Sequence, residues 1–198
     1  MSRKVDIQRE EWLSRGFLKL AKYTLTHERF DGSQAGPMTR ELVIRSSAVG
    51  VVPYDPVSEQ FLLIEQFRLA AHFAGLPGWQ REIVAGIADR DESSEELARR
   101  EAREEANCTV TDLVEMYRCL LSPGMTNEVL IVYCGRMASL PRTGVHGLES
   151  EHEDIRSSLF HMDQVPELLE KGHTGNGPLI MALQWMQLNR ERMRKLWR

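Results

Sequence analysis

The chain has 198 residues and a formal net charge of −4, with 42% hydrophobic and 27% charged residues. This is the composition of an ordinary globular protein with a buried core, and the acidic balance argues against nucleic acid, which would favour a basic patch. No apolar run approaches the length of a membrane span, and the first residues lack the apolar stretch of a secretory signal. We therefore expect neither nucleic acid nor a membrane as a partner.

The first part of the chain predicts strands. Residues 17–26 alternate enough for a strand, and the glycines and proline of 28–38 predict a turn. Residues 39–56 read as one long strand or two joined strands, and 59–68 read as a strong strand.

The N-terminal strands suggest a division of the chain into two parts. Residues 1–45 are expected to form a β-rich segment that is too small to be stable alone. Such a segment predicts a homodimer in which the N-terminal segment is exchanged between copies. Residues 46–198 are then expected to form the main domain.

The rest of the chain mixes strands and helices. A short strand over 79–87 is followed by a helix over 91–107. Two strands around a Pro-Gly loop, an acidic loop, a strand and two helices complete the chain at 109–122, 127–137, 145–154, 155–162, 163–172 and 177–197. This order predicts an α/β fold in which helices lie against a mixed sheet.

Three cysteines bear on the compartment. Cys108, Cys119 and Cys134 are odd in number, lack C-x-x-C spacing and stand in apolar or strand-like surroundings. They predict free, buried thiols in a reducing compartment, and hence a cytoplasmic location.

The helix over 91–107 has recognisable ends. Ser93 followed by Glu96 is the pattern of a capping box, so the helix is expected to start there. Asn107 stands at the expected end and accepts the left-handed conformation of a helix stop. Pairs such as Glu95 with Arg99 would stabilise a solvent-exposed helix, which is the structural alternative to a functional site.

Charge is concentrated around this helix. Residues 86–108 hold eight acidic and four basic residues, and we expect the unpaired excess on Glu101, Glu104 and Glu105. Like charges four residues apart, as at Glu101 and Glu105, destabilise a helix by about 0.2–0.5 kcal/mol. A divalent cation between them would remove that cost, and Mg²⁺ prefers carboxylates together with substrate phosphates. The pattern therefore predicts a site for Mg²⁺, with Mn²⁺ possible in its place.

The same stretch resembles a known motif. From Gly86 the chain reads G-x5-E-x7-R-E-A-x-E-E-x-N-C, which resembles the Nudix box, G-x5-E-x7-R-E-U-x-E-E-x-G-U, with U a bulky apolar residue. Ala102 and Cys108 are small for U, and Asn107 replaces the last glycine. The matching positions are Gly86, Glu92, Arg100, Glu101, Glu104 and Glu105. The resemblance implies a Mg²⁺-dependent hydrolase of nucleoside diphosphates linked to another moiety, built as an α/β/α sandwich around a mixed sheet.

The resemblance also implies roles for the residues of the motif. Glu101 and Glu105 would bind metal together with the carbonyl of Ala85. Glu104 would support the metal site directly or through water, and Arg100 would orient a glutamate. Gly86 would let the backbone approach closely, and Glu92 is expected to be structural, either in the motif or as a favourable charge at the helix start.

Residues outside the motif choose the substrate. The chain resembles the bacterial ADP-ribose pyrophosphatase subfamily along nearly its whole length, in stretches such as LLIEQFRLAA, EIVAGI and SPGMTNE. Pro123 stands where that subfamily has a proline in its substrate loop, and Met125 where close relatives often have a small residue. The positions that match substrate contacts are Phe17, Arg40, Arg68, Glu82, Met125 and Glu128. Core packing is the alternative for Phe17, and a surface charge at a strand end is the alternative for Arg68.

The acidic loop offers further carboxylates. Glu149, Glu151 and Glu153 alternate, so an extended loop would place them on one side. A solvated loop is the structural alternative, but a hydrolase also needs a group that deprotonates the attacking water. The resemblance makes Glu151 the general base and Glu153 a metal ligand, with Glu149 as the second choice for the base.

The resemblance implies hydrolysis of ADP-ribose to AMP and ribose 5-phosphate. One alternative keeps the chemistry and changes the substrate to another nucleotide sugar such as GDP-mannose. Another alternative is a non-catalytic ADP-ribose sensor, although such proteins typically lose glutamates of the motif, which are intact here.

Overall fold

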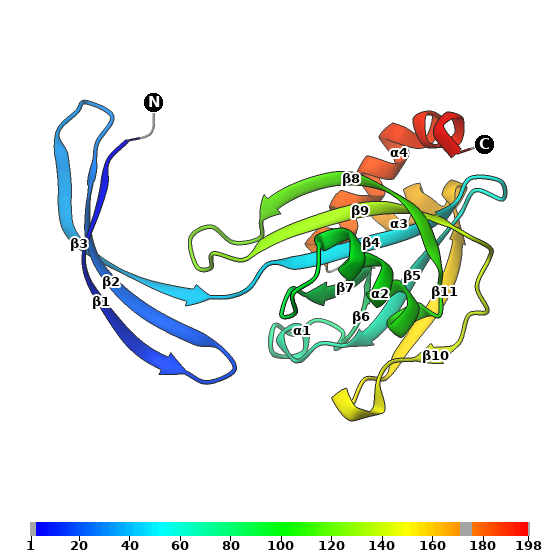
Figure 1. Cartoon of the computed structure of the whole chain (residues 1–198), viewed down its shortest axis with the longest axis horizontal. Coiled ribbons are helices and arrows are strands. Elements are labelled where there is room, and N and C mark those ends of the chain that lie inside the picture. The colour runs from blue at the N-terminus through cyan, green and yellow to red at the C-terminus, as the bar shows by residue number, and fades with distance from the viewer. Residues whose placement is uncertain (1–2, 171–175, 198) are drawn as a thin grey trace. The chain divides into compact units, whose positions relative to one another are not determined.

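The computed structural model describes residues 3–170 and 176–197, except for the side chain of Glu151 (Figure 1). The chain divides into two compact units. The first unit comprises residues 1–47 and 119–130, and the second comprises residues 48–118 and 131–198. Among the helices of the described residues, none combines the length and apolar composition that a bilayer crossing needs.

The first unit is built on an antiparallel three-stranded sheet in the order β1-β2-β3. Its strands are β1 (Val5–Arg15), β2 (Lys19–Glu28) and β3 (Gln34–Ile44). The strand β1 was not predicted, because nearly all of its side chains are exposed and no apolar alternation marks it. The residues after β3 hold the 119–130 loop, since Arg45 pairs with Glu128 at 2.6 Å.

The second unit contains most of an eight-stranded mixed sheet of the described residues, in the order β10-β11-β5-β4-β9-β8, with β6 paired to β5 and β7 to β4. Residues 61–64 are all buried, as expected for a strand covered on both faces. The strands are β4 (Ala48–Asp55), β5 (Gln60–Phe67), β6 (Trp79–Glu82), β7 (Val84–Ile87), β8 (Val110–Leu120), β9 (Val129–Met137), β10 (Val145–His146) and β11 (Ile155–His161).

The helices of the second unit agree with the prediction in the two longest cases, α2 (Ser94–Ala106) and α4 (Gly177–Trp197). The others are α1 (Leu69–Phe73), α3 (Val165–Glu170) and the 3-10 turns η1 (Glu149–Glu151) and η2 (Met162–Gln164). The short helix α1 was not predicted, and the predicted strand over 79–87 is the two strands β6 and β7. The predicted mixed α/β fold is confirmed.

The helix α2 packs on β7 and β4 through a face of small residues. Leu97, Ala98, Ala102 and Ala106 are fully buried on this face. Alanines let the helix backbone come close to the sheet, so the glutamates between them are brought next to β7 and the residues that follow it.

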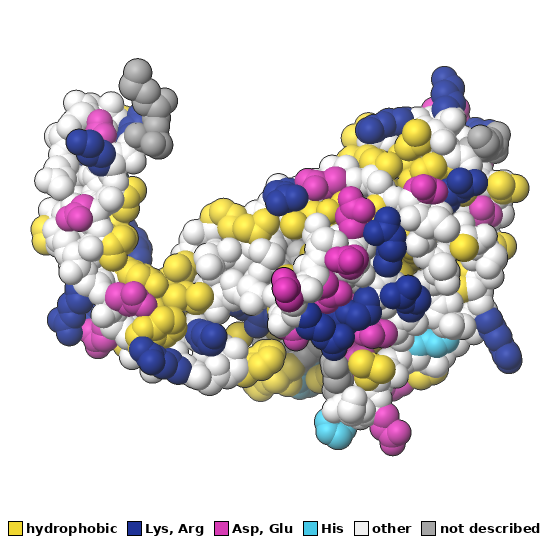
Figure 2. Space-filling view, viewed as in Figure 1, with side chains coloured by type: hydrophobic (Ala, Val, Ile, Leu, Met, Phe, Trp, Pro, Cys, Tyr) yellow, Lys and Arg dark blue, Asp and Glu magenta, His cyan; other side chains and the backbone are white. Residues whose placement is uncertain are grey.

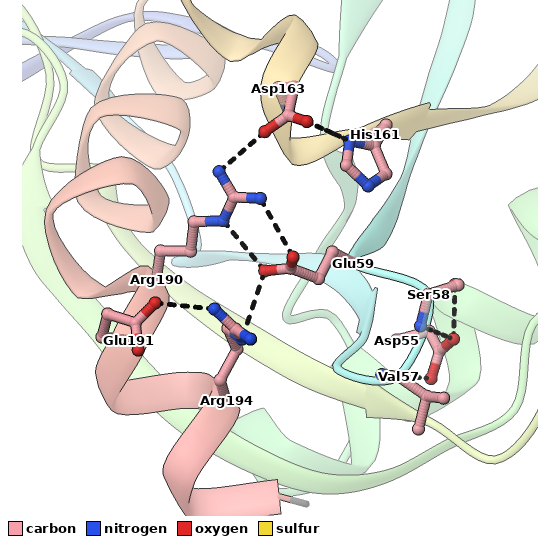
Figure 3. A network of polar contacts seen from close by, with 9 residues as sticks. All are labelled: Asp55, Val57, Ser58, Glu59, His161, Asp163, Arg190, Glu191 and Arg194. Carbon is pink, nitrogen blue, oxygen red and sulfur yellow. Dashed lines mark hydrogen bonds and ion pairs between the residues drawn. The ribbon is translucent and has the colours of Figure 1, made fainter.

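The helix α4 is held to the β4–β5 turn by a polar network (Figure 3). Arg190 donates to both carboxylate oxygens of Glu59, at 2.9 and 3.0 Å, and to Asp163 at 2.8 Å. Arg194 lies 3.5 Å from Glu59, and its other partner is Glu191 at 2.8 Å. Attraction to Arg190 and Arg194 outweighs burial and lowers the pKa of Glu59.

Candidate active site

The helix α2 is fixed at both ends by its own residues. The hydroxyl of Ser93 accepts from the Glu96 amide at 3.2 Å, and the Glu96 carboxylate accepts from the Ser93 amide at 2.8 Å. This is the predicted capping box. Asn107 has φ 48° and ψ 36°, which is the predicted left-handed helix stop. Both ends therefore set where the glutamates of α2 lie.

Glu105 is a buried carboxylate on α2, and the residue is 3% exposed. It accepts a hydrogen bond from the amide of Ala85 at 3.0 Å. Among the described residues, no lysine or arginine forms an ion pair with it. Burial, followed by the neighbouring charges of Glu101 and Glu153, raises the pKa of Glu105 well above its ordinary value. Such a carboxylate gains stability when a cation approaches.

Glu101 lies against the backbone of Gly86. A Cβ atom added at Gly86 would come 2.0 Å from Oε1 of Glu101, so only glycine leaves room for this carboxylate. Burial raises the pKa of Glu101, although Arg100 acts in the opposite direction. Glu101, Glu105 and the 85–86 backbone therefore meet at one place in the second unit.

Arg100 connects several acids of the motif. It lies 2.8 Å from each of Glu92, Glu101 and Glu104. The expectation that Glu101 and Glu104 are unpaired is therefore wrong, although one positive charge is shared among three carboxylates, and Glu105 has no cationic partner among the described residues. The reason is local: Glu96 serves the helix cap, which leaves Arg100 free to turn toward the other acids.

Glu92 lies before the helix and accepts hydrogen bonds from the side chain of Arg100. It accepts from Nη2 at 2.8 Å and from Nε at 3.2 Å, and the hydrogen bond from Arg100 lowers the pKa of Glu92. This geometry matches the structural role expected for Glu92.

The acidic loop is not extended, so that expectation is wrong. Residues 149–151 form a 3-10 turn, and His152 follows with φ 56°. Glu153 is oriented by its own loop, because its carboxylate accepts from the amide of Leu148 at 3.1 Å. Glu149 is exposed. The predicted general base, Glu151, closes the turn, but its side chain lies outside the described part of the structure.

Arg68 and Glu82 form a pair beside these carboxylates. Glu82 is 6% exposed and accepts from Nε of Arg68 at 3.1 Å and from Nη2 at 2.7 Å. Burial opposes the charge of Arg68, but Glu82 above all, with Glu105 and Glu153, raises its pKa. The alternative of an isolated surface charge at a strand end is therefore wrong for Arg68.

Asn176 is a polar residue that the sequence analysis missed. It stands directly before α4, and its side-chain amide donates to Glu82 at 3.0 Å. The signal available was an asparagine before Gly177 and Pro178, which is typical of a helix N-cap. Nothing in the sequence linked that cap to Glu82.

The remaining predicted substrate residues belong to the first unit. Phe17 lies in the β1–β2 turn and is 88% exposed, so the alternative of core packing is wrong. The guanidinium carbon of Arg45 lies over the ring of Phe17, 5.7 Å from its centre. Arg40 is exposed on β3. The 119–130 loop carries Pro123, Met125 and Glu128. The structure thus groups these five predicted residues in one unit and the carboxylates in the other.

The donors near α2 suit a hard divalent cation. The charge of Glu153 contributes to the raised pKa of both Glu101 and Glu105, and the Ala85 backbone lies beside Glu105. Among the described residues, no three acidic, histidine or cysteine side chains are already closed around one point. An open oxygen set fits Mg²⁺, which keeps several waters and uses substrate phosphates as ligands.

The charges around α2 are mixed in sign. Figure 2 shows acidic and basic side chains next to one another over the region where Figure 1 places α2. Arg99 and Glu95 form the predicted pair at 3.4 Å on this helix. The exposed side of α2 is thus a salt-bridged surface, and its buried edge holds the unpaired carboxylate of Glu105.

Comparison with known proteins identifies the family of the chain. Residues 44–183 match the NUDIX domain. An ADP-ribose pyrophosphatase of Escherichia coli K12 is 37% identical over 193 residues, covering 98% of this chain and 92% of its own. The ADP-ribose pyrophosphatase of Haemophilus influenzae is 33% identical, covering 98% and 91%. A GDP-mannose pyrophosphatase of Yersinia enterocolitica is 30% identical, covering 96% and 98%.

A solved structure supports the fold. The crystal structure of an ADP compounds hydrolase superposes with a TM-score of 0.73 at 18% identity, covering 96% of this chain and 97% of the other. The family predicted from the motif is thus confirmed, and the chain belongs to the Nudix family.

Proposed function

We propose that this chain hydrolyses the pyrophosphate of ADP-ribose to AMP and ribose 5-phosphate with Mg²⁺ as cofactor. The observation that carries the choice of substrate is that relatives named for ADP-ribose are more similar than those named for GDP-mannose. The carboxylates around α2, with Arg68 beside them, support the reaction class. Such a set suits the binding and cleavage of a diphosphate.

In this proposal Arg68 binds a phosphate oxygen of the substrate. Glu82 takes its Nε and Nη2, and among the described residues nothing accepts from Nη1, which leaves that donor for a ligand. The negative charges of Glu105 and Glu153 also act on this guanidinium and help to raise its pKa. A planar guanidinium fixed on one side by a carboxylate is well suited to an anionic oxygen on the other.

Glu101, Glu105, Glu153 and the carbonyl of Ala85 would hold Mg²⁺, or Mn²⁺ in its place. When bound, the cation supplies Lewis-acid stabilisation of phosphate charge and lowers the pKa of coordinated water. Arg100 keeps Glu101 and Glu104 in position through contacts of 2.8 Å. Leu148 does the same for Glu153 through its amide.

The proton of the attacking water goes to Glu151 in this proposal, with Glu149 as the second choice. The water oxygen forms a bond to one phosphorus, and the bond from that phosphorus to the bridging oxygen breaks. The bridging oxygen leaves with the other phosphate, which gives two monophosphates. Both glutamates belong to the 3-10 turn, which lies on the same loop as Glu153.

The first unit supports a homodimer that exchanges residues 1–45. A small sheet with large exposed apolar side chains is unlike a finished surface. These side chains are each 44% to 92% exposed: Val5, Ile7, Leu13, Phe17, Leu18 and Phe30. Phe17 would then pack on the adenine of the substrate together with Arg40 of the partner subunit. Light scattering during size exclusion tests the dimer, and a monomer at micromolar concentration would contradict it.

A substrate panel tests the function. Purified protein with Mg²⁺ is given ADP-ribose, GDP-mannose and other nucleotide sugars, and phosphate is counted after coupling to a phosphatase. We expect ADP-ribose to lead the panel and a chelator to abolish turnover. Faster turnover of GDP-mannose than of ADP-ribose would mean that GDP-mannose is the substrate, and the proposed type of reaction would stand.

Two further predictions remain open. Binding of ADP-ribose without turnover, unchanged in Glu105→Gln, would favour the non-catalytic sensor. The cytoplasmic location is still a prediction from the cysteines, of which Cys108 and Cys134 are buried and Cys119 is half-buried, all with free thiols.

A further inference from the structure

We infer that Asn176 is a positioning residue for the substrate-binding arginine, acting through Glu82, and this rests on the proposed function. Its side-chain amide spans two elements that are far apart in the sequence. Nδ2 donates to Oε1 of Glu82 at 3.0 Å, and Oδ1 accepts from the amide of Leu179 at 3.1 Å. Asn176 therefore joins the start of α4 to the carboxylate that grips Arg68.

The geometry allows only one orientation of the amide. The Leu179 amide can only donate, so it must face Oδ1. Nδ2 is then left to face Glu82, whose carboxylate can only accept when ionised. Asparagine satisfies both neighbours, whereas aspartate would satisfy the helix and repel Glu82.

Glu82 needs every donor it has, because it is a buried charge. The residue is 6% exposed, and its oxygens accept from Arg68, Asn176 and, at 3.4 Å, Gln66. A buried carboxylate that loses one of its donors reorients or recruits water. Arg68 is bound to both carboxylate oxygens, so it must follow any rotation of Glu82.

The consequence falls on the ligand side of Arg68. Its side chain is 46% exposed, and Nη1 is the donor that Glu82 does not use. If the guanidinium turns, this donor no longer points where the phosphate is bound. Loss of the Asn176 contact should therefore weaken substrate binding more than it slows the chemical step.

Three substitutions separate this role from helix capping. Asn176→Ser keeps an N-cap acceptor but is too short to reach Glu82. Asn176→Asp keeps the cap and adds a charge next to Glu82. The matched control is Asn189→Ser on the same helix, because the Asn189 side chain donates to the Trp185 carbonyl at 2.9 Å and accepts from Arg192 at 3.4 Å, and among the described residues no hydrogen bond joins it to Glu82.

Steady-state kinetics on ADP-ribose and thermal unfolding are measured for each variant. We expect Asn176→Ser to raise KM about tenfold and to change kcat by less than about threefold, since a hydrogen bond to a charged group is lost. Asn176→Asp should raise KM further, and Asn189→Ser should leave KM unchanged. In a Glu82→Gln background, Asn176→Ser should add nothing to KM. A lower Tm with unchanged KM, or effects that multiply in the double variant, would overturn the inference.

A measurement without substrate keeps the inference separate from the proposed function. The Nε–H signal of Arg68, assigned by comparison with Arg68→Lys, is followed by NMR. Its proton should exchange faster with water in Asn176→Ser than in the unchanged protein or in Asn189→Ser. Equal exchange in all three would refute the positioning role. Failure of the unchanged protein to hydrolyse ADP-ribose would refute only the proposed substrate.

Discussion

Two arginines of the second unit each form ion pairs with several acids, but the pKa values of the acids around them are shifted in different directions. Arg100 contacts Glu92, Glu101 and Glu104, and Arg190 contacts Glu59 and Asp163. The pKa of each arginine is raised by a hydrogen-bonded glutamate above all, so both remain charged. The local chemistry of the two centres is therefore the same.

The difference lies in the acids that are not neutralised. Around Arg190, a second arginine, Arg194, reaches Glu59, and the pKa of Glu59 falls. Around Arg100, one arginine contacts three acids, Glu105 has no cationic partner among the described residues, and burial raises the pKa values of Glu101 and Glu105. Glu59, which two arginines contact, stabilises the fold, whereas the carboxylates near Arg100 hold charge that a cation can satisfy.

Glu105→Gln should produce the largest effect on activity. Removal of a carboxylate that we propose as a metal ligand is expected to lower kcat about a thousandfold. The same change should raise the Tm of the metal-free protein at neutral pH, because a buried carboxylate is replaced by a neutral group. Kinetics with Mg²⁺ and thermal unfolding with a chelator measure both. Glu95→Gln, at an exposed position of α2, is the control, and a fall in the Tm of Glu105→Gln would contradict the argument.

The sign of the pH dependence follows from the raised pKa of Glu105. The folded state holds the proton more tightly than the unfolded state, so Glu105 costs nothing below the ordinary carboxyl pKa. The cost grows as pH rises and is complete above the raised pKa of the folded state. The Tm advantage of Glu105→Gln in the metal-free protein should therefore appear as pH rises through this window and vanish in acid.

Gly86→Ala should reduce activity with a small cost in stability. The new Cβ would come 2.0 Å from Oε1 of Glu101, and the flexible side chain can only move away. We expect kcat/KM to fall about a hundredfold as the carboxylate is displaced. Gly144→Ala is the matched control, because its Cβ would meet only the ring of His146 at 3.8 Å. Equal activity of the two variants would show that Glu101 does not need its present position.

Glu59→Gln should have the opposite profile to Glu105→Gln. The substitution removes the negative charge that Arg190 and Arg194 contact, so the free energy of unfolding should fall by about 1–2 kcal/mol, with kcat unchanged. The folded pKa of Glu59 is lowered, so its contribution is present above the ordinary carboxyl pKa and is lost as pH falls through the folded value. Urea unfolding at neutral and acidic pH measures this. A stability difference that persists in acid would contradict it.

The comparison also shows what the sequence could predict. Around Arg100 the partners lie between residues 92 and 104, and the spacing of four residues predicted that Glu101 and Glu105 lie together, whereas the place of Gly86 beside them was implied by the resemblance to the Nudix box. Around Arg190 the partner Glu59 is 131 residues away, and no local pattern joins them. The contact between Asn176 and Glu82, which are 94 residues apart, was missed for the same reason. The strand β1 was missed because its exposed side chains have no alternation.

Substitutions at Asn107 should have the smallest effect on stability. They test the conformation of the helix end without changing the charges of the helix. The φ of 48° at Asn107 is one that glycine adopts freely and alanine does not. The helix end is closed by backbone bonds, from Asn107 to Arg103 at 3.0 Å and from Cys108 to Ala102 at 2.9 Å, which no side chain at 107 supplies. Asn107→Gly should therefore change stability by no more than about 0.5 kcal/mol, and Asn107→Ala should lower it by about 1 kcal/mol.

Activity should be equal in these two variants, because the residues that we propose as metal ligands keep their charges and their neighbours. Urea unfolding and kcat with Mg²⁺ are measured in parallel. A loss of kcat in Asn107→Ala that exceeds its loss of folded protein would mean that the end of α2 sets the position of Glu105. In that case the effects on activity of the Glu105 charge and of the helix end could not be separated. The contrast between the Arg100 and Arg190 networks would then reduce to a difference in helix packing.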